Sequence, residues 1–154
     1  MPDAHPTHDE PTDRDGLPRS LSDRLGYLLG QAHLTHRSIA APLLATLGLG
    51  VKEFGALAVV NDEGPLSQQR LGERLRVDRT TMVAVVDQLE RQGFVERQRN
   101  PEDRRAYSLR VTERGQRVLR QAAEAAEQAE AAFLTPLPAR DRGALKDALR
   151  LLLR

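Results

Sequence analysis

The middle of the chain constrains the fold most strongly, because signals for two short helices are followed directly by signals for two strands. Ser67 and Asp78 each precede a segment of helical periodicity and are favoured N-cap residues, and Gly93 is a typical residue just beyond a helix. Residues 94–99 and 106–112 then alternate with a period of two, which predicts two strands. A helix, a tight turn, a second helix and a hairpin form the layout of a winged helix-turn-helix.

Further helices are predicted on both sides of this segment. Periodic apolar residues indicate helices over residues 21–47, 51–62, 113–134 and 139–153. We expect Ser20 or Ser22 to cap the first of them and Pro42 to kink or split it. Thr112 is a suitable N-cap for the third. Because the chain has no Trp and only 3% aromatic residues, Leu, Ala and Val must supply most of the packing, which favours a mainly helical fold with a small β-hairpin.

Residues 1–19 differ from the rest of the chain. They contain four of its nine prolines and a single large aliphatic residue, Leu17, so we expect a disordered acidic tail. Residues 1–18 carry five acids against Arg14 alone, whereas residues 65–117 carry twelve arginines against eight acids. The net charge of +1 therefore averages an acidic tail and a basic segment, so the local charge and not the net charge is informative. A GC-rich genome is the alternative explanation for the excess of arginine.

Several classes of protein are excluded or disfavoured by what the sequence lacks. It has no cysteine, which excludes disulfides, thiolate metal sites, cysteine nucleophiles and thiol redox sensors. No Ser-His-Asp arrangement, phosphate loop or dinucleotide-binding glycine pattern is present, so we expect neither an enzyme nor a cofactor. Neither a signal peptide nor an apolar run long enough to cross a bilayer is visible, so we expect a cytoplasmic protein with no membrane partner.

The first turns of the second short helix have the chemistry of a DNA-recognition helix. Arg79 can donate two hydrogen bonds to guanine. Thr80 and Thr81 can bond a base or contact a thymine methyl group, and Val83 can pack on that methyl group. The apolar residues on the opposite side of this helix are expected to pack against the preceding helix. Gln68, in the first turn of that preceding helix, could reach a phosphate.

The predicted hairpin offers a second contact with DNA. Its tip and return strand contain Asn-Pro-Glu-Asp-Arg-Arg, and an arginine on a thin wing suits the narrow minor groove. We expect one of Arg104 and Arg105 to contact DNA and the other to brace the hairpin by pairing with Asp103 or with a backbone carbonyl. Arg97 and Arg99 on the first strand could also contact phosphate.

Four sequence stretches point to a known family. They are Leu-Gly-Glu-Arg-Leu-Arg-Val-Asp-Arg-Thr-Thr-Met-Val from Leu71, Leu-Glu-Arg-Gln-Gly-Phe-Val-Glu-Arg from Leu89, Asn-Pro-Glu-Asp-Arg-Arg-Ala from Asn100 and Leu-Arg-Val-Thr-Glu-Arg-Gly from Leu109. Together they resemble the MarR family of bacterial transcription regulators. The resemblance covers residues 21–154 and is densest over residues 66–115, and its most specific part is the last pair of stretches.

The resemblance implies a homodimer that pairs through its first and last helices and binds a pseudo-palindromic operator in double-stranded DNA. Such regulators usually repress, and they often release DNA when a small phenolic or lipophilic ligand binds between the dimer base and the DNA-binding lobe. The resemblance implies a MarR-like domain over residues 20–154, with dimerisation helices in 20–50 and 112–154 and a winged helix-turn-helix in 51–111. Many members have Thr-Arg where this chain has Val83-Ala84, so we expect fewer direct base contacts and more methyl packing.

His33 and His36 stand three residues apart on the apolar side of the first predicted helix. Together with Phe54 they are the residues that we expect to line a pocket for a small organic effector. Their spacing also suits two ligands of one zinc ion, but the sequence marks no further ligand. A metal-responsive regulator that uses His33 and His36 is therefore an alternative, and no metal site is assigned. A second alternative, prompted by Val83-Ala84, is a dimeric interaction protein with a vestigial recognition helix and no sensing function.

Overall fold

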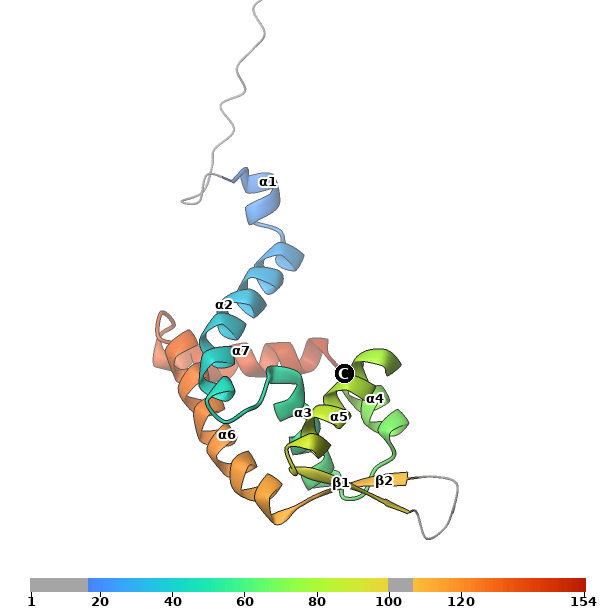
Figure 1. The fold of residues 1–154 in the computed structure, drawn as a ribbon. Coiled ribbons are helices and arrows are strands. Elements are labelled where there is room, and N and C mark those ends of the chain that lie inside the picture. Colours follow the sequence, from blue (N-terminus) through green and yellow to red (C-terminus); the bar gives the residue numbers. More distant parts are fainter. Residues whose placement is uncertain (1–16, 100–106) are drawn as a thin grey trace, which may run out of the picture. The chain divides into compact units, whose positions relative to one another are not determined.

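The structure is a computed structural model that describes residues 17–99 and 107–154 (Figure 1). The chain divides after His36 into two units, and each is described by itself. In the described residues, five helices precede a two-stranded hairpin and two further helices follow it. This order confirms the prediction of a mainly helical fold with a small hairpin, and it contains one more helix than the sequence indicated.

The first predicted helix is in fact two helices, α1 (Arg19–Ser22) and α2 (Leu25–Ala45). The break lies at Asp23, the C-cap of α1, whereas α2 continues through Pro42. Of the two effects predicted for Pro42, the split is wrong and the kink stays a prediction. Pro42 lies in the last turn of α2, where the missing N–H removes a hydrogen bond near an end that already lacks helical partners.

Ser20 and Ser22 do not act as the predicted N-caps. The first helix begins after Pro18, whose carbonyl accepts hydrogen bonds from the backbone N–H groups of Leu21 and Ser22 at 3.0 and 3.1 Å. Ser20 and Ser22 lie inside α1, and the Ser22 hydroxyl is buried without a hydrogen-bond partner. A side chain caps a helix only from the non-helical residue before the first turn, so a serine further along cannot do so.

The two helices that follow begin and end where the local signals predict. α3 (Val51–Glu63) ends at Gly64, whose φ of +81° lies in the left-handed region that glycine adopts without strain. α4 (Gln68–Leu75) is capped by Ser67, whose hydroxyl accepts a hydrogen bond from the backbone N–H of Arg70 at 3.2 Å.

The next helix, α5 (Arg79–Arg91), is joined to α4 by a tight turn in which Arg76 has a φ of +52°. Asp78 caps α5 as predicted, because its Oδ1 accepts a hydrogen bond from the Thr81 backbone N–H at 2.9 Å. The chain leaves the helix at Gly93, with a φ of +71°. α4, the tight turn and α5 together form a helix-turn-helix.

The hairpin consists of β1 (Val95–Arg99) and β2 (Tyr107–Val111), which pair antiparallel. Leu109 of β2 also exchanges backbone hydrogen bonds with Leu66, at 2.7 and 3.4 Å, and this bridge ties the hairpin to the segment before α4. The two predicted strands are confirmed. The predicted turn between them lies outside the described residues.

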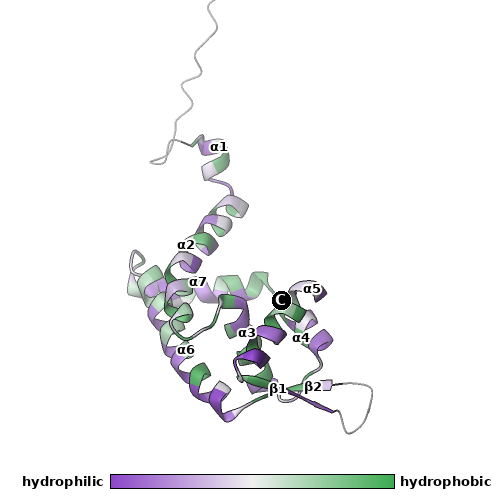
Figure 2. Ribbon diagram, in the orientation of Figure 1, coloured by the Kyte–Doolittle hydropathy of each residue, from purple (hydrophilic) through white to green (hydrophobic). Residues whose placement is uncertain are grey.

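After the hairpin, α6 (Glu113–Phe133) is capped by Thr112, and α7 (Ala139–Leu152) follows. Hydrophilic and hydrophobic residues alternate along the ribbon of α6 (Figure 2), and Ala122 and Ala129 on its inner side are fully buried. Ala129 lies seven residues after Ala122, which is two helical turns, so both belong to one narrow contact stripe.

The core of the second unit joins the three central helices to the hairpin and to α6. Its largest fully buried side chains come from four helices, from β2 and from the segment after α2. They are Leu44 of α2, Leu49 after α2, Leu57 of α3, Leu71 of α4, Met82, Val86 and Leu89 of α5, and Leu109 of β2. Phe94 and Val95 at the start of the hairpin are part of the same cluster. This shared core holds the hairpin beside α4 and α5.

Candidate nucleic-acid interface

The two sides of α5 differ sharply in exposure. Met82, Val85, Val86 and Leu89 are all buried, whereas Arg79 and Thr80 are exposed and Val83 is 38% exposed. A Cβ atom on the buried Gly72 of α4 would lie 3.7 Å from Met82 Cγ, which shows how closely the two helices pack. The side of α5 that the sequence assigned to DNA is therefore the side left uncovered by the core.

Thr81 has a more restricted chemistry than the sequence suggested. Its hydroxyl donates a hydrogen bond to Asp78 Oδ2 at 2.7 Å, while its backbone N–H donates to Oδ1 of the same carboxylate. Since the hydroxyl proton is already used, the side chain can accept a hydrogen bond or offer its methyl group to a base. The hydrogen bonds from Thr81 also lower the pKa of the Asp78 carboxyl.

Replacing Asp78 with alanine should lower the Tm by about 3 °C, because the first turn of α5 loses its cap. The depressed pKa of Asp78 means that the cap stabilises the fold above the unfolded-state pKa. That contribution is lost as the pH falls through the lower folded-state pKa. The Tm difference between wild type and Asp78→Ala should accordingly be constant near neutral pH and shrink below about pH 4.

Calorimetry or circular dichroism between pH 3 and pH 7 measures this difference. Asp78→Asn is the matched control, since asparagine caps helices as well as aspartate does but does not titrate. A Tm difference for Asp78→Ala that stays the same down to pH 3 would contradict the assignment of the cap.

A groove of about 840 Å³ lies between α4, the start of α5 and the hairpin. Gln68, Arg76, Arg79 and Arg97 line this groove, together with the buried Met82. Guanidinium and amide groups are among the side chains that bond phosphate oxygens. The groove brings together three of the residues that the sequence proposed for DNA contact, namely Gln68, Arg79 and Arg97.

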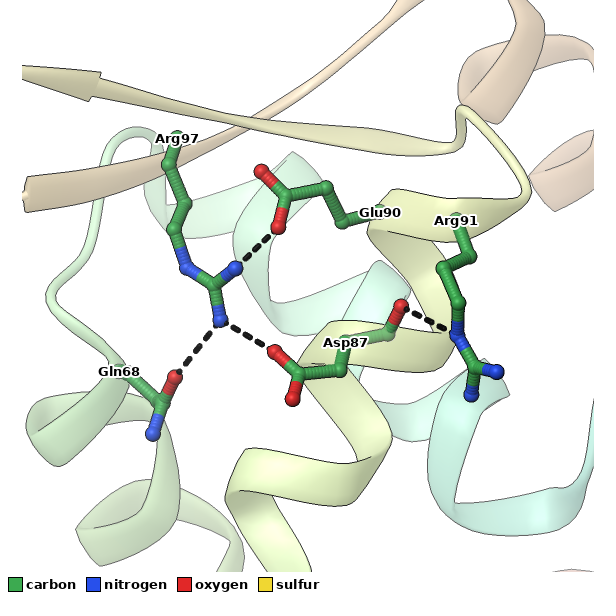
Figure 3. A network of polar contacts seen from close by, with 5 residues as sticks. All are labelled: Gln68, Asp87, Glu90, Arg91 and Arg97. Carbon is green, nitrogen blue, oxygen red and sulfur yellow. Dashed lines mark hydrogen bonds and ion pairs between the residues drawn. The ribbon is translucent and has the colours of Figure 1, made fainter.

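Arg97 takes part in a network inside the protein (Figure 3). Its Nη2 donates to Asp87 Oδ1 at 2.7 Å and to Gln68 Oε1 at 3.3 Å, and its Nη1 donates to Glu90. The hydrogen bond with Asp87 raises the pKa of the Arg97 guanidinium, so this group is charged at any physiological pH. The backbone carbonyl of Asp87 accepts a further hydrogen bond from Arg91 Nε at 3.2 Å.

The sequence did not single out Asp87 and Glu90 as site residues. One signal could have found them. Arg97 lies two residues after Val95, so both point to the same face of the hairpin, and Arg97 pairs across the hairpin with Leu109. Val95 and Leu109 are buried. An arginine on the inner side of a hairpin needs acceptors, and carboxylates on the neighbouring helix are the natural candidates.

Other predicted site residues stay predictions. Asp103, Arg104 and Arg105 lie outside the described residues. His33 is exposed and His36 is half-buried in the first unit, and Phe54 is half-buried in the second. The ligand pocket that these residues are expected to line stays a prediction. In the part of the chain that the structure describes, no group of three or more His, Asp or Glu side chains is placed to hold a metal ion.

Comparison with known proteins decides the family. A model of the MarR family matches residues 50–107, which include α3, α4, α5 and β1. A putative transcriptional regulatory protein for the hcr operon of Thauera aromatica is 32% identical over 136 residues, which cover 88% of this chain and 82% of that protein. The chain belongs to the MarR family.

Solved structures of MarR-type regulators have the same fold. The transcriptional repressor CouR, bound to a 23-mer DNA duplex, matches with a TM-score of 0.81 and 30% identity over 90% of this chain and 99% of that one. The PcaV regulator of Streptomyces coelicolor, in complex with its natural ligand, matches with a TM-score of 0.75 and 28% identity over 86% of this chain and 94% of that one.

Membership of the MarR family makes this protein a DNA-binding regulator of transcription with a winged helix. The prediction that it is not an enzyme is confirmed, because its relatives are regulators of transcription. Over residues 17–99 and 107–154, no helix combines the length and apolar character needed to span a bilayer.

Proposed function

We propose that this protein is a homodimeric repressor that binds a pseudo-palindromic operator through α5 and releases it when a small organic ligand binds. The observation that supports DNA recognition most directly is the division of α5 into a buried side and an exposed side. Arg79, Thr80 and Val83 are exposed at its N-terminal end, which is the end that enters the major groove in helix-turn-helix proteins. A phosphate contact by Gln68 and a minor-groove contact by Arg104 or Arg105 complete the proposed footprint.

Apolar side chains left exposed by a single chain support the homodimer. α7 buries none of its residues, and Leu151, Leu152 and Leu153 are 64%, 67% and 68% exposed. In the first unit, several leucines on or near α2 are also exposed: Leu21, Leu25, Leu28, Leu29 and Leu34. Exposed apolar surface of this kind is typical of a site for another protein chain. Pairing of two copies through these helices would cover it.

The repressor and ligand parts of the proposal rest on relatives. CouR is described as a transcriptional repressor, and PcaV was solved with its natural ligand. By analogy, we propose that this chain represses transcription and holds an organic effector near His33, His36 and Phe54.

DNA binding is tested with a duplex selected from a randomised pool, by fluorescence anisotropy over a range of salt concentrations. Arg79→Ala should weaken binding by about 1–3 kcal/mol, or roughly 5- to 150-fold, because a bidentate contact with guanine is lost. Arg91→Ala is the matched control, since Arg91 is an exposed arginine at the opposite, C-terminal end of the same helix and outside the helices proposed for dimerisation. Equal affinity of both variants and wild type for the selected duplex would refute the proposed role of α5.

The dimer and the effector need separate measurements. Sedimentation should give twice the chain mass of 17.1 kDa.

A panel of phenolic and lipophilic acids should contain compounds that raise the Tm and release the duplex, and His36→Ala should weaken that response. Equilibrium dialysis with zinc tests the metal-responsive alternative, which requires bound metal that is lost in His36→Ala. A monomer, or a panel without effect, would remove the corresponding part of the proposal.

A further inference from the structure

One side chain, Arg97, joins three elements (Figure 3). From β1 its guanidinium donates to Asp87 and Glu90 on α5 and to Gln68 in the first turn of α4. The Arg97 side chain is 30% exposed, so these bonds are partly shielded from water. A single surface ion pair contributes little to the stability of a protein. A planar guanidinium that bonds three acceptors, however, fixes the positions of those acceptors relative to one another.

The network gives the Gln68 amide a defined orientation. A guanidinium has N–H donors and no acceptor, so Gln68 must present its carbonyl oxygen to Arg97. Its NH2 group, which has two N–H donors, is then directed to other acceptors. Gln68 is the first residue of α4 and lines the groove, where a phosphate oxygen is the acceptor that helix N-termini favour.

The same network controls negative charge on α5. The side chains of Asp87 and Glu90 are 47% and 38% exposed, and they lie on the helix proposed to enter the DNA. Unpaired carboxylates there would repel the phosphate backbone. Arg97 pairs with both of them, so the helix approaches DNA without two uncompensated negative charges.

We propose that Arg97 is a positioning residue for DNA binding, which holds the hairpin against α5, neutralises Asp87 and Glu90 and orients the Gln68 amide for a phosphate. This inference rests on the proposed function. It assigns Arg97 a role different from the phosphate contact that the sequence suggested, because its hydrogen bonds with Gln68, Asp87 and Glu90 are made within the protein.

The decisive variant is Arg97→Lys. It keeps the positive charge, so a direct phosphate contact would survive with little change in affinity. A lysine ammonium lacks the planar fork that bonds Gln68, Asp87 and Glu90 together. On the positioning model, affinity for the selected duplex therefore falls by about tenfold. The slope of log affinity against log salt should stay unchanged, because the number of cations does not change.

A double-mutant cycle with Gln68→Ala tests the route of the effect. If Arg97 acts partly through Gln68, the two substitutions together should weaken binding by less than the product of their separate effects. If Arg97→Lys merely destabilised the fold, it would lower the Tm, but its affinity for the selected duplex well below the Tm would stay normal. Binding is therefore compared at a temperature where circular dichroism shows every variant folded.

A measurement without DNA completes the test. Backbone amide exchange in the β1 and β2 strands of the free protein should accelerate about tenfold in Arg97→Lys, while exchange in the middle of α6 stays unchanged. Unchanged exchange in the hairpin, or normal affinity of Arg97→Lys when Arg79→Ala is impaired, would overturn the positioning role alone. If wild type selects no duplex at all, the proposed function fails, and with it the purpose assigned to Arg97.

Discussion

Gly115→Ala is expected to lower the free energy of unfolding by about 2–3 kcal/mol. Gly115 lies in the first turn of α6, where its backbone N–H donates to the Thr112 hydroxyl at 3.0 Å. A Cβ atom at this position would overlap the Phe94 carbonyl oxygen and would lie 2.9 Å from both the Phe94 carbonyl carbon and Val111 Cγ1. Two of these atoms are backbone, so the methyl group can be accommodated only if α6 moves away from the hairpin.

The movement would have further costs at the same junction. Thr112 donates from its backbone N–H to the Phe94 carbonyl at 3.0 Å and from its hydroxyl to the Gly93 carbonyl at 2.7 Å. Both hydrogen bonds, and the cap of α6, depend on the close approach that Gly115 permits. Displacing α6 would therefore disturb the contact between this helix and the DNA-binding segment.

Gly55→Ala is the matched control for Gly115→Ala. Gly55 lies inside α3, and a Cβ there would lie 3.8 Å from Leu75 Cδ2, an ordinary van der Waals distance. Alanine should stabilise α3 there by about 0.5–1 kcal/mol, because glycine is a poor helix residue. Urea unfolding at one fixed protein concentration measures both variants, since dimer stability depends on concentration. Equal stability of Gly115→Ala and wild type would show that α6 does not approach Phe94 this closely.

Leu89→Ala should lower the free energy of unfolding by about 3 kcal/mol, within the range of 2–5 kcal/mol for buried leucines. Leu89 lies on the buried side of α5 and is 1% exposed, among core residues of α3 and the hairpin. Removing its side chain leaves a cavity that the packed neighbours cannot fill. Thermal unfolding should show a Tm lower by about 6–12 °C.

Val83→Ala separates the two sides of the same helix. Val83 is 38% exposed, so the change to alanine should alter the free energy of unfolding by less than about 0.5 kcal/mol. The loss of methyl contact with a thymine should instead reduce affinity for the selected duplex severalfold. Leu89→Ala, measured where it is folded, should bind that duplex almost normally. The reverse pattern, with Val83→Ala unstable and Leu89→Ala stable, would refute the assignment of the two sides.

The helix boundaries in the DNA-binding segment could be predicted because they depend on short-range hydrogen bonds. Ser67, Asp78 and Thr112 each accept a bond from a backbone N–H three residues further along the chain. Such contacts form whatever the rest of the fold does. The first helix was predicted less well, since neither serine stands where a cap is needed and the chain stays helical through Pro42, in the last turn of α2.

The sequence by itself determined the fold class, the two capped helices, the two strands and the amphipathic division of α5, because all of these follow from contacts or periodicities within one element. Only the tertiary structure decided what Arg97 and Gly115 do. Arg97 bonds residues 7, 10 and 29 positions away, and Gly115 faces the carbonyl of Phe94 in another element. A side chain's chemistry restricts its possible partners, but only the folding of distant segments onto one core places one of those partners within reach.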